Sequence, residues 1–198
     1  MIRKINPESY LIIICGLPGT GKSTIAAKLI EGLTDYVLVD QNAIRRKLGY
    51  KIMPQRFDLA LRTIDRQLAK VLQGGQGAIF DSVNRYTFRR QQIYGVASCC
   101  GMRVVTLEVV CPEEVAKSRM SKRKRPKGDK LVSDPKYPRV YDKLKKEWEP
   151  VEMDFLHFGS DHVNHVIYDS HLNKMTRVIE QRGSRGFISK IEKILTKE

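Results

Sequence analysis

Residues 16–23, Gly-Leu-Pro-Gly-Thr-Gly-Lys-Ser, form a glycine-rich pattern that ends in a lysine and a hydroxyl residue. The pattern follows an apolar run and precedes a helical pattern, which is the context in which such a loop binds phosphate. Its backbone N–H groups and the following helix N-terminus can point at phosphate oxygens. We therefore predict that Lys22 contacts nucleotide phosphates and that the Ser23 hydroxyl binds Mg²⁺. The predicted phosphate loop comprises Gly16, Leu17, Pro18, Gly19, Thr20, Gly21, Lys22, Ser23 and Thr24.

Two charged residues follow the next apolar run, which covers residues 36–39. Asp40 stands directly after this run, and Arg45 follows a little more than one helical turn later. A carboxylate in this place can accept a proton from a hydroxyl group that attacks a γ-phosphate in line. We predict that Asp40 serves as this base and that Arg45 contacts the acceptor. An N-cap of the following helix is the alternative for Asp40, and the two roles are compatible.

A second set of polar residues follows the apolar run at residues 77–80. Asp81 comes directly after the run, where a carboxylate can meet Mg²⁺ or the acceptor. Asn84 can form hydrogen bonds at the same end of the run, and Arg90 lies in the next helical pattern. We predict that Asp81 holds the metal with Ser23, and that Asn84 and Arg90 contact the acceptor.

Basic residues are concentrated in one segment. Residues 119–146 contain twelve Lys or Arg against three Asp, so they carry a net charge of +9 out of +14 for the whole chain. Arg119 and Arg123 are four residues apart on one helix face, so both can close over one triphosphate. We predict a basic lid over approximately residues 119–146. The remaining charge fits either a polyanionic acceptor such as RNA or DNA, or plain solubility, and the sequence leaves both open.

Short apolar runs alternate with helical patterns along the chain, which predicts a parallel sheet covered by helices. Helical spacing of apolar residues predicts a long helix over residues 57–72 and a last helix near residues 187–195. The expected fold is α/β, with three layers and a helical basic lid. The five predicted parallel strands cover residues 10–15, 36–39, 77–80, 102–110 and 164–168.

Length and composition predict one domain over residues 1–198, because 41% hydrophobic residues suffice for a core of this size. No run of eighteen apolar residues occurs, and the first ten residues lack an apolar signal core. We therefore expect a cytoplasmic protein with no membrane segment. No aspartate is followed by glycine at the third position, and residues 173–176 lack the Asp of an NKxD motif, which disfavours a signalling GTPase.

Four histidines, at positions 157, 162, 165 and 171, lie close together in the sequence. Such spacing raises the question of a metal site. No Cys and no paired acidic ligand completes a familiar pattern, and His165 begins an apolar run. The sequence therefore favours a structural role for these histidines.

Together these motifs resemble the P-loop kinases that include polynucleotide 5′-hydroxyl kinases, adenylylsulfate kinases and zeta-toxin-like sugar-nucleotide kinases. The resemblance spans roughly residues 10–150 and implies the three-layer P-loop NTPase fold and the use of ATP. Arg119 and Arg123 match the lid arginines of the polynucleotide kinases. Asp81, Asn84 and Arg90 resemble that family's D-x-T-N motif and following arginine, although Val83 stands where the threonine is usual.

A second departure concerns the base. In the polynucleotide kinases an aspartate lies three residues before the arginine, whereas that position here is Asn42, which cannot accept a proton at neutral pH. Asp40 instead resembles the first aspartate of the adenylylsulfate kinases' D-G-D-N motif. The resemblance thus implies either that Asp40 has taken over the role or that transfer proceeds with little base assistance.

These observations predict an ATP- and Mg²⁺-dependent kinase with a hydroxyl acceptor, leaning toward a hydroxyl of a nucleic acid or nucleotide. A small-metabolite kinase is the second possibility, and a nucleotide-binding module or slow ATPase is the third. The sequence makes no prediction of the oligomeric state. The predicted catalytic residues are Lys22, Asp40, Arg119 and Arg123, and the predicted acceptor contacts are Asp40, Asn42, Arg45, Asn84 and Arg90.

Overall fold

The computed structural model describes residues 9–49, 54–123, 138–156 and 162–197. The middle of the predicted lid, residues 124–137, lies outside this part of the chain. Within the described ranges, no helix combines the length and the apolar character needed to cross a membrane.

The central sheet has six strands in the order β2-β3-β1-β4-β5-β6. The first five strands of the chain pair in parallel, as predicted, and β6 pairs antiparallel with β5 at the sheet edge. The predicted apolar runs form these strands. Two of them, β1 and β3, are buried along their whole length, which is why they are apolar throughout. The strands are β1 (Tyr10–Cys15), β2 (Tyr36–Asp40), β3 (Gly77–Asp81), β4 (Arg103–Val110), β5 (Val163–Asp169) and β6 (Lys174–Ile179).

The sixth strand was not predicted from the sequence. In β6 only Met175 is buried, and the other residues of the strand are exposed or half-buried. An edge strand of this kind carries no apolar run, so its sequence does not stand out from a loop.

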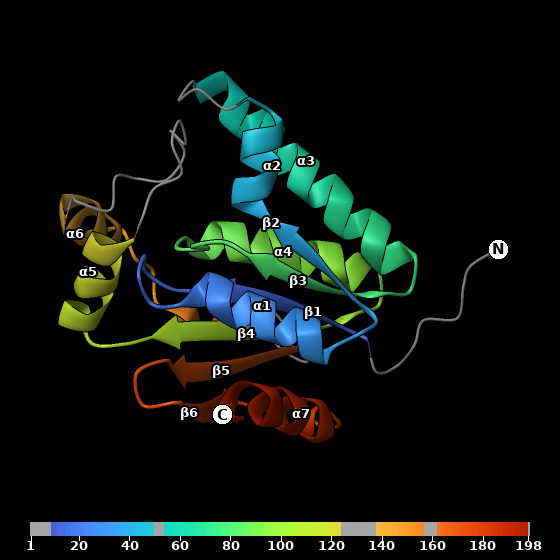
Figure 1. The fold of residues 1–198 in the computed structure, drawn as a ribbon. Coiled ribbons are helices and arrows are strands. Elements are labelled where there is room, and N and C mark those ends of the chain that lie inside the picture. The colour runs from blue at the N-terminus through green and yellow to red at the C-terminus, as the bar shows by residue number, and fades with distance from the viewer. Residues whose placement is uncertain (1–8, 50–53, 124–137, 157–161, 198) are drawn as a thin grey trace.

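Helices cover both faces of the sheet, which confirms the predicted three-layer α/β arrangement (Figure 1). On one face α1 (Lys22–Gly32) packs beside α7 (Arg185–Thr196), and the predicted last helix is thereby confirmed. On the other face lie α3 (Pro54–Gln73) and α4 (Thr87–Cys99). The predicted apolar face of α3 is buried at Ile64, Leu68 and Leu72.

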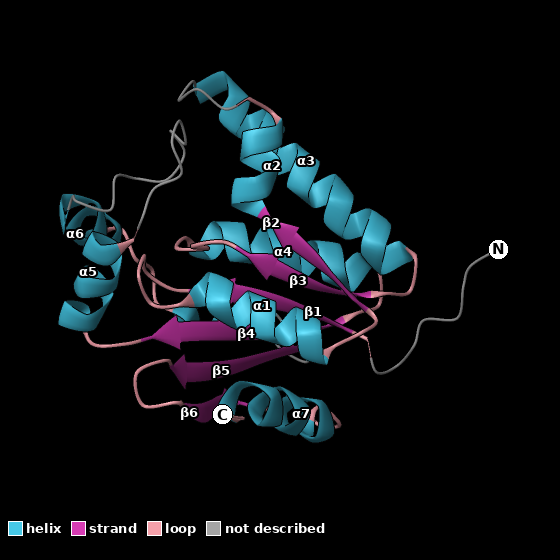
Figure 2. Cartoon of the chain, in the orientation of Figure 1, coloured by secondary structure: helices cyan, strands magenta, loops and turns pink. Residues whose placement is uncertain are grey.

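The parallel strands end at one edge of the sheet, where the remaining helices stand (Figure 2). There α2 (Gln41–Lys47) follows β2, and α5 (Glu113–Lys122) follows β4. The helix α6 (Pro138–Lys146) lies beside α5, and a short 3₁₀ helix, η1 (Val151–Leu156), leads back to the sheet. The sequence-predicted polar residues after β1, β2 and β3 therefore converge at this edge.

Candidate active site

The glycine-rich loop connects β1 to α1, as the pattern predicts. Gly16 has φ 144° and Gly19 has φ 83°, values that residues with a side chain rarely adopt. A Cβ atom on Gly16 would lie 2.3 Å from the Val109 carbonyl oxygen, and one on Gly19 would lie 2.3 Å from the Ala116 carbonyl oxygen. The two glycines therefore let the loop pass directly against β4 and α5.

Lys22 begins α1, and its Nζ atom donates a hydrogen bond to the Leu17 carbonyl oxygen at 2.8 Å. Burial lowers the pKa of this lysine to about 8, although the nearby Asp81 carboxylate acts in the opposite direction. An ammonium group held inside a backbone loop is placed to exchange its carbonyl partner for phosphate oxygens.

Ser23 and Asp81 lie side by side across the loop. The Ser23 hydroxyl lies close enough to the Asp81 carboxylate to lower its pKa as a hydrogen-bond donor, and Asp81 is only 6% exposed. Burial raises the pKa of Asp81, while the bonds from Ser23 and the charge of Lys22 partly oppose this shift. A hydroxyl group and a buried carboxylate are oxygen ligands of the kind Mg²⁺ prefers, so the pair fits the ion predicted for it.

Asp40 is the last residue of β2, and its neighbour in the sheet register is Asp81 at the end of β3. Its carboxylate accepts a hydrogen bond from the backbone N–H of Asn42 at 2.7 Å and so caps α2. The capping alternative raised from the sequence is therefore confirmed. Asn42 is exposed and Arg45 is half-buried one turn further along α2, beside the same sheet edge.

Asn84 lies directly behind the phosphate loop. It has a left-handed conformation with φ 47°, is 5% exposed, and its side-chain amide donates to the Ile14 carbonyl oxygen at 2.8 Å. Its Oδ1 atom has no hydrogen-bond partner among the described residues. Asn84 thus joins the end of β3 to the end of β1 and keeps one acceptor atom available at the site.

The prediction that Arg90 contacts the acceptor is wrong. Its side chain is 0% exposed and forms an ion pair with Asp154 of η1, with Nε to Oδ2 at 2.6 Å. The guanidinium group also donates to the carbonyl oxygens of Asn84, Glu149 and Pro150. Arg90 therefore holds Asn84 and the η1 segment from inside the core, and its spacing after β3 could not reveal this because Asp154 lies 64 residues away.

Arg119 connects α5 to the phosphate loop through one intermediate residue. Its Nη1 donates to Ser170 Oγ at 2.8 Å, and Ser170 Oγ donates to the Thr20 carbonyl oxygen at 2.7 Å. Arg123, at the end of α5, lies close enough to lower the pKa of both Lys22 and Asp81. Both predicted lid arginines thus stand beside the loop. Ser170 was missed from the sequence, where a single polar residue after β5 gives no signal.

The helices α5 and α6, which lie at the two ends of the predicted lid, are joined by ion pairs. Lys117 of α5 pairs with Asp142 of α6 at 2.8 Å, and Glu113 of α5 pairs with Lys145 of α6 at 2.7 Å. The hydrogen bonds from Lys117 and Lys145 lower the pKa of Glu113 to about 2. Beneath these surface pairs, Ala116 and Met120 of α5 and Tyr141 of α6 form a buried apolar cluster, against which Leu17 of the phosphate loop packs.

The fold and the phosphate loop define a P-loop protein, and the family comparison agrees. A model described as an AAA domain matches residues 11–135, and the chain belongs to this family. No curated protein matches the sequence.

Solved kinase structures share this fold at low sequence identity. A putative kinase from Chloroflexus aurantiacus is 18% identical, with a TM-score of 0.61, and the match covers 96% of this chain and 97% of that chain. A gluconokinase from Sinorhizobium meliloti 1021 is 15% identical, with a TM-score of 0.55 and coverage of 96% and 93%. A chain of a Pnkp1/Rnl/Hen1 complex is 18% identical, with a TM-score of 0.54; 65% of this chain matches 44% of that one. These likenesses show that the chain has the fold of these solved structures.

Proposed function

We propose that this protein is an ATP- and Mg²⁺-dependent kinase that transfers the γ-phosphate to a hydroxyl group, with a nucleic-acid or nucleotide hydroxyl as the favoured acceptor. One observation carries the proposal: the phosphate loop, the Ser23–Asp81 pair and the Asp40 carboxylate all lie at adjacent strand ends. A phosphate donor, its metal ion and an acceptor hydroxyl could meet at this edge.

The nucleotide phosphates would bind at the first turn of α1, which contains no acidic side chain. Gly16, Leu17, Pro18, Gly19, Thr20, Gly21 and Thr24 would supply backbone or hydroxyl contacts, as in other loops of this pattern. Ser23 and Asp81 would hold Mg²⁺ directly or through water. The ion would neutralise charge on the β- and γ-phosphates during transfer.

In the proposed reaction the acceptor oxygen attacks the γ-phosphorus, and the bond from phosphorus to the β,γ-bridging oxygen breaks to release ADP. The hydroxyl proton passes to the Asp40 carboxylate and then to solvent. Lys22 stabilises negative charge on the transferred group, and Arg119 and Arg123 supply further positive charge from the lid side. The hydrogen bond from Asn42 N–H holds the Asp40 side chain at the mouth.

For the acceptor, the basic segment beside the mouth supports a polyanion. The described part of α6 alone carries Arg139, Lys143, Lys145 and Lys146. Lys145 pairs with Glu113 of α5 and Lys143 lies 3.9 Å from Glu147, so part of this charge is offset, and Arg139 and Lys146 would supply the rest to phosphates of a bound strand. Asn42, Arg45 and the Oδ1 atom of Asn84 would contact the acceptor nearer the reaction centre.

The test is transfer of labelled γ-phosphate from Mg-ATP to 5′-hydroxyl RNA and DNA oligonucleotides, beside pooled small hydroxyl metabolites and adenylylsulfate. Label on an oligonucleotide, with affinity that falls steeply between about 50 and 200 mM salt, supports the proposal. Label only on metabolites makes the protein a small-metabolite kinase.

A nucleotide-binding module or slow ATPase is distinguished in the same experiment. Such a protein would hydrolyse ATP at a rate that no acceptor raises, or would not hydrolyse it. The matched control is Lys22→Met, which removes the loop ammonium and should abolish any genuine transfer.

A further inference from the structure

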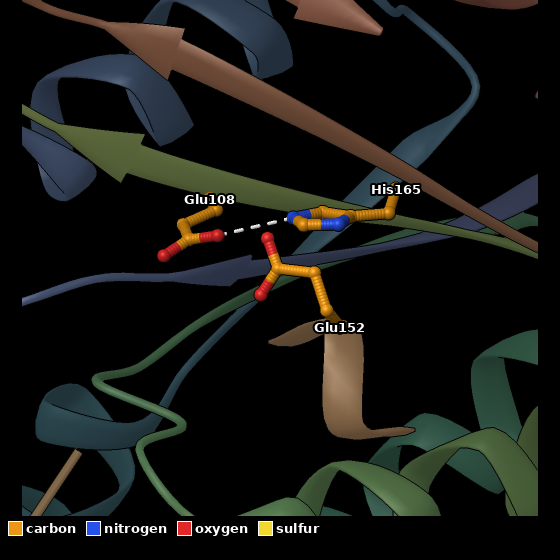
Figure 3. Close-up of side chains that lie close together, drawn as sticks. All are labelled: Glu108, Glu152 and His165. Atoms are coloured by element: carbon orange, nitrogen blue, oxygen red, sulfur yellow. Dashed lines mark hydrogen bonds and ion pairs between the residues drawn. The ribbon is translucent and has the colours of Figure 1, made fainter. Parts of the chain in front are cut away.

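A second group of polar side chains lies on the sheet face that carries α4 and η1, apart from the Ser23–Asp81 pair. Glu108 of β4, His165 of β5 and Glu152 of η1 point toward one another (Figure 3). His165 Nε2 and Glu108 Oε2 are 3.0 Å apart, and one ligand atom from each of the three residues lies within 4.8 Å of the others. Glu108 lies 57 residues before His165, whereas Glu152 belongs to η1, the element directly before β5.

Two of these three polar side chains, His165 and Glu108, are largely buried, which is unusual for ionisable groups. The His165 side chain is 0% exposed and that of Glu108 is 13% exposed, while Glu152 is exposed and opens the group to solvent. The Phe155 ring stacks on the imidazole, with ring centroids 6.1 Å apart. His165 is thus fixed in orientation, with Nε2 directed at both carboxylates and Nδ1 without a partner among the described residues (Figure 3).

The charges of the group do not balance from the described side chains alone. A neutral imidazole leaves two carboxylate charges together, and a protonated one neutralises only one of them. Arg90, a buried cation of the same core, directs its guanidinium group at Asp154. A divalent ion with a neutral imidazole would bring the net charge of the group to zero.

We propose that Glu108, Glu152 and His165 form a binding site for a divalent transition-metal ion, with Zn²⁺ the best fit. One imidazole nitrogen and two carboxylate oxygens are a donor set that suits zinc, and the fourth position would hold water. Ligand atoms around a tetrahedral zinc ion stand roughly 3.3–3.6 Å apart, given metal–ligand distances of about 2.0–2.2 Å. The exposed Glu152 side chain can close the remaining gap by rotating.

The position of the site suggests what the ion would do. Glu152 belongs to η1, through which the chain returns from α6 to the sheet. Glu108 also lines a small cavity that it shares with Gly16 and Leu17 of the phosphate loop. A bound ion would therefore fasten the lid's return segment to β4 and β5 beside the nucleotide site. This inference does not depend on the proposed kinase activity.

Binding of Zn²⁺ to the metal-free full chain, without nucleotide and with excess Mg²⁺, tests the proposal by isothermal titration calorimetry. We expect one saturable site and a rise in the thermal unfolding midpoint. Glu152→Gln should weaken the affinity at least about tenfold. Because Glu152 is exposed, this variant should fold, and Glu108→Gln provides a second. The matched control is Glu114→Gln, an exposed glutamate on α5, which should bind Zn²⁺ like the wild type.

Absorption of the Co²⁺-substituted protein identifies the ligands independently. Carboxylate and imidazole ligation gives d–d bands without a thiolate charge-transfer band. A thiolate band would assign binding to the cysteines and overturn the proposal. Absence of a saturable site, unchanged affinity in both glutamine variants, or displacement of Zn²⁺ by Mg²⁺ would overturn it as well.

Discussion

Asp154→Asn tests the internal role assigned to Arg90. The Asp154 carboxylate accepts hydrogen bonds from Arg90 Nε at 2.6 Å, from Arg90 Nη2 at 2.7 Å and from the Tyr94 hydroxyl at 2.7 Å. Both members of the ion pair are 0% exposed. The substitution preserves the size of the side chain but removes the only carboxylate that the described structure pairs with this guanidinium.

The expected loss follows from that burial. Removing one partner of a buried ion pair leaves an uncompensated charge and costs about 3–5 kcal/mol of unfolding free energy. Domains of this size have total stabilities of about 5–15 kcal/mol, so the variant should be folded but fragile. In urea its unfolding midpoint should fall by at least about 1 M with little change in the slope.

The assay is urea unfolding followed by circular dichroism, and the control is Asp142→Asn. Asp142 also pairs with a cation, Lys117 at 2.8 Å, but its side chain is 48% exposed, so its loss should cost under about 1 kcal/mol. Equal, small losses of unfolding free energy in both variants would refute the internal role of Arg90. So would an Asp154→Asn variant of normal stability in which the proposed transfer reaction showed a raised KM for the acceptor alone, because Arg90 would then act at the acceptor.

Three further predictions concern the phosphate loop and the base. Burial lowers the pKa of Lys22 to about 8, and bound phosphates favour its charged form. The affinity for ATP, measured by calorimetry, should therefore be full below about pH 8 and fall about tenfold per pH unit above it. The Lys22→Arg variant should lose this pH dependence. Gly19→Ala should destabilise the protein by more than about 1 kcal/mol and impair nucleotide binding, because the added Cβ would lie 2.3 Å from the backbone of α5. Gly95→Ala is the control: a Cβ there would have no atom within 4 Å, so it should not destabilise the protein. Asp40→Asn should slow phosphate transfer by about 10²–10⁴-fold with unchanged ATP affinity; a raised rate in Asn42→Asp beside an unaffected Asp40→Asn would reassign the base.

Several features at the site could be predicted because they are encoded over a few neighbouring residues. The glycine pattern at residues 16–23 specifies its own backbone turn, and the apolar runs specify strands whose carboxyl ends share one edge in a parallel sheet. That rule places Asp40 and Asp81 at the same edge, and the pairing of β2 with β3 in the structure makes them neighbours. The helical spacing predicted for Arg119 and Arg123 holds only in part, because α5 ends at Lys122 and Arg123 is the extended residue that follows it.

Other features depend on partners that are distant in the sequence. From sequence Arg90 resembles an acceptor-binding residue, but in the structure it pairs with Asp154. Arg119 is hydrogen-bonded to Ser170, 51 residues later, which in turn donates to the phosphate loop. The edge strand β6 is defined by its pairing with β5 and not by its own pattern. None of these relations has a local signal.

The histidines show most clearly which features the local sequence determines and which depend on the tertiary structure. From sequence alone, His165 has no acidic partner at metal-ligand spacing and reads as a core residue, and its complete burial agrees. Only the tertiary structure brings Glu108 and Glu152 to its ring, from a strand 57 residues earlier and from the segment that follows the lid. Local sequence determines backbone conformation and the period of buried faces, because these depend on neighbouring residues. Which charges meet inside the core depends on how the distant segments pack, and that is decided only when the chain is folded.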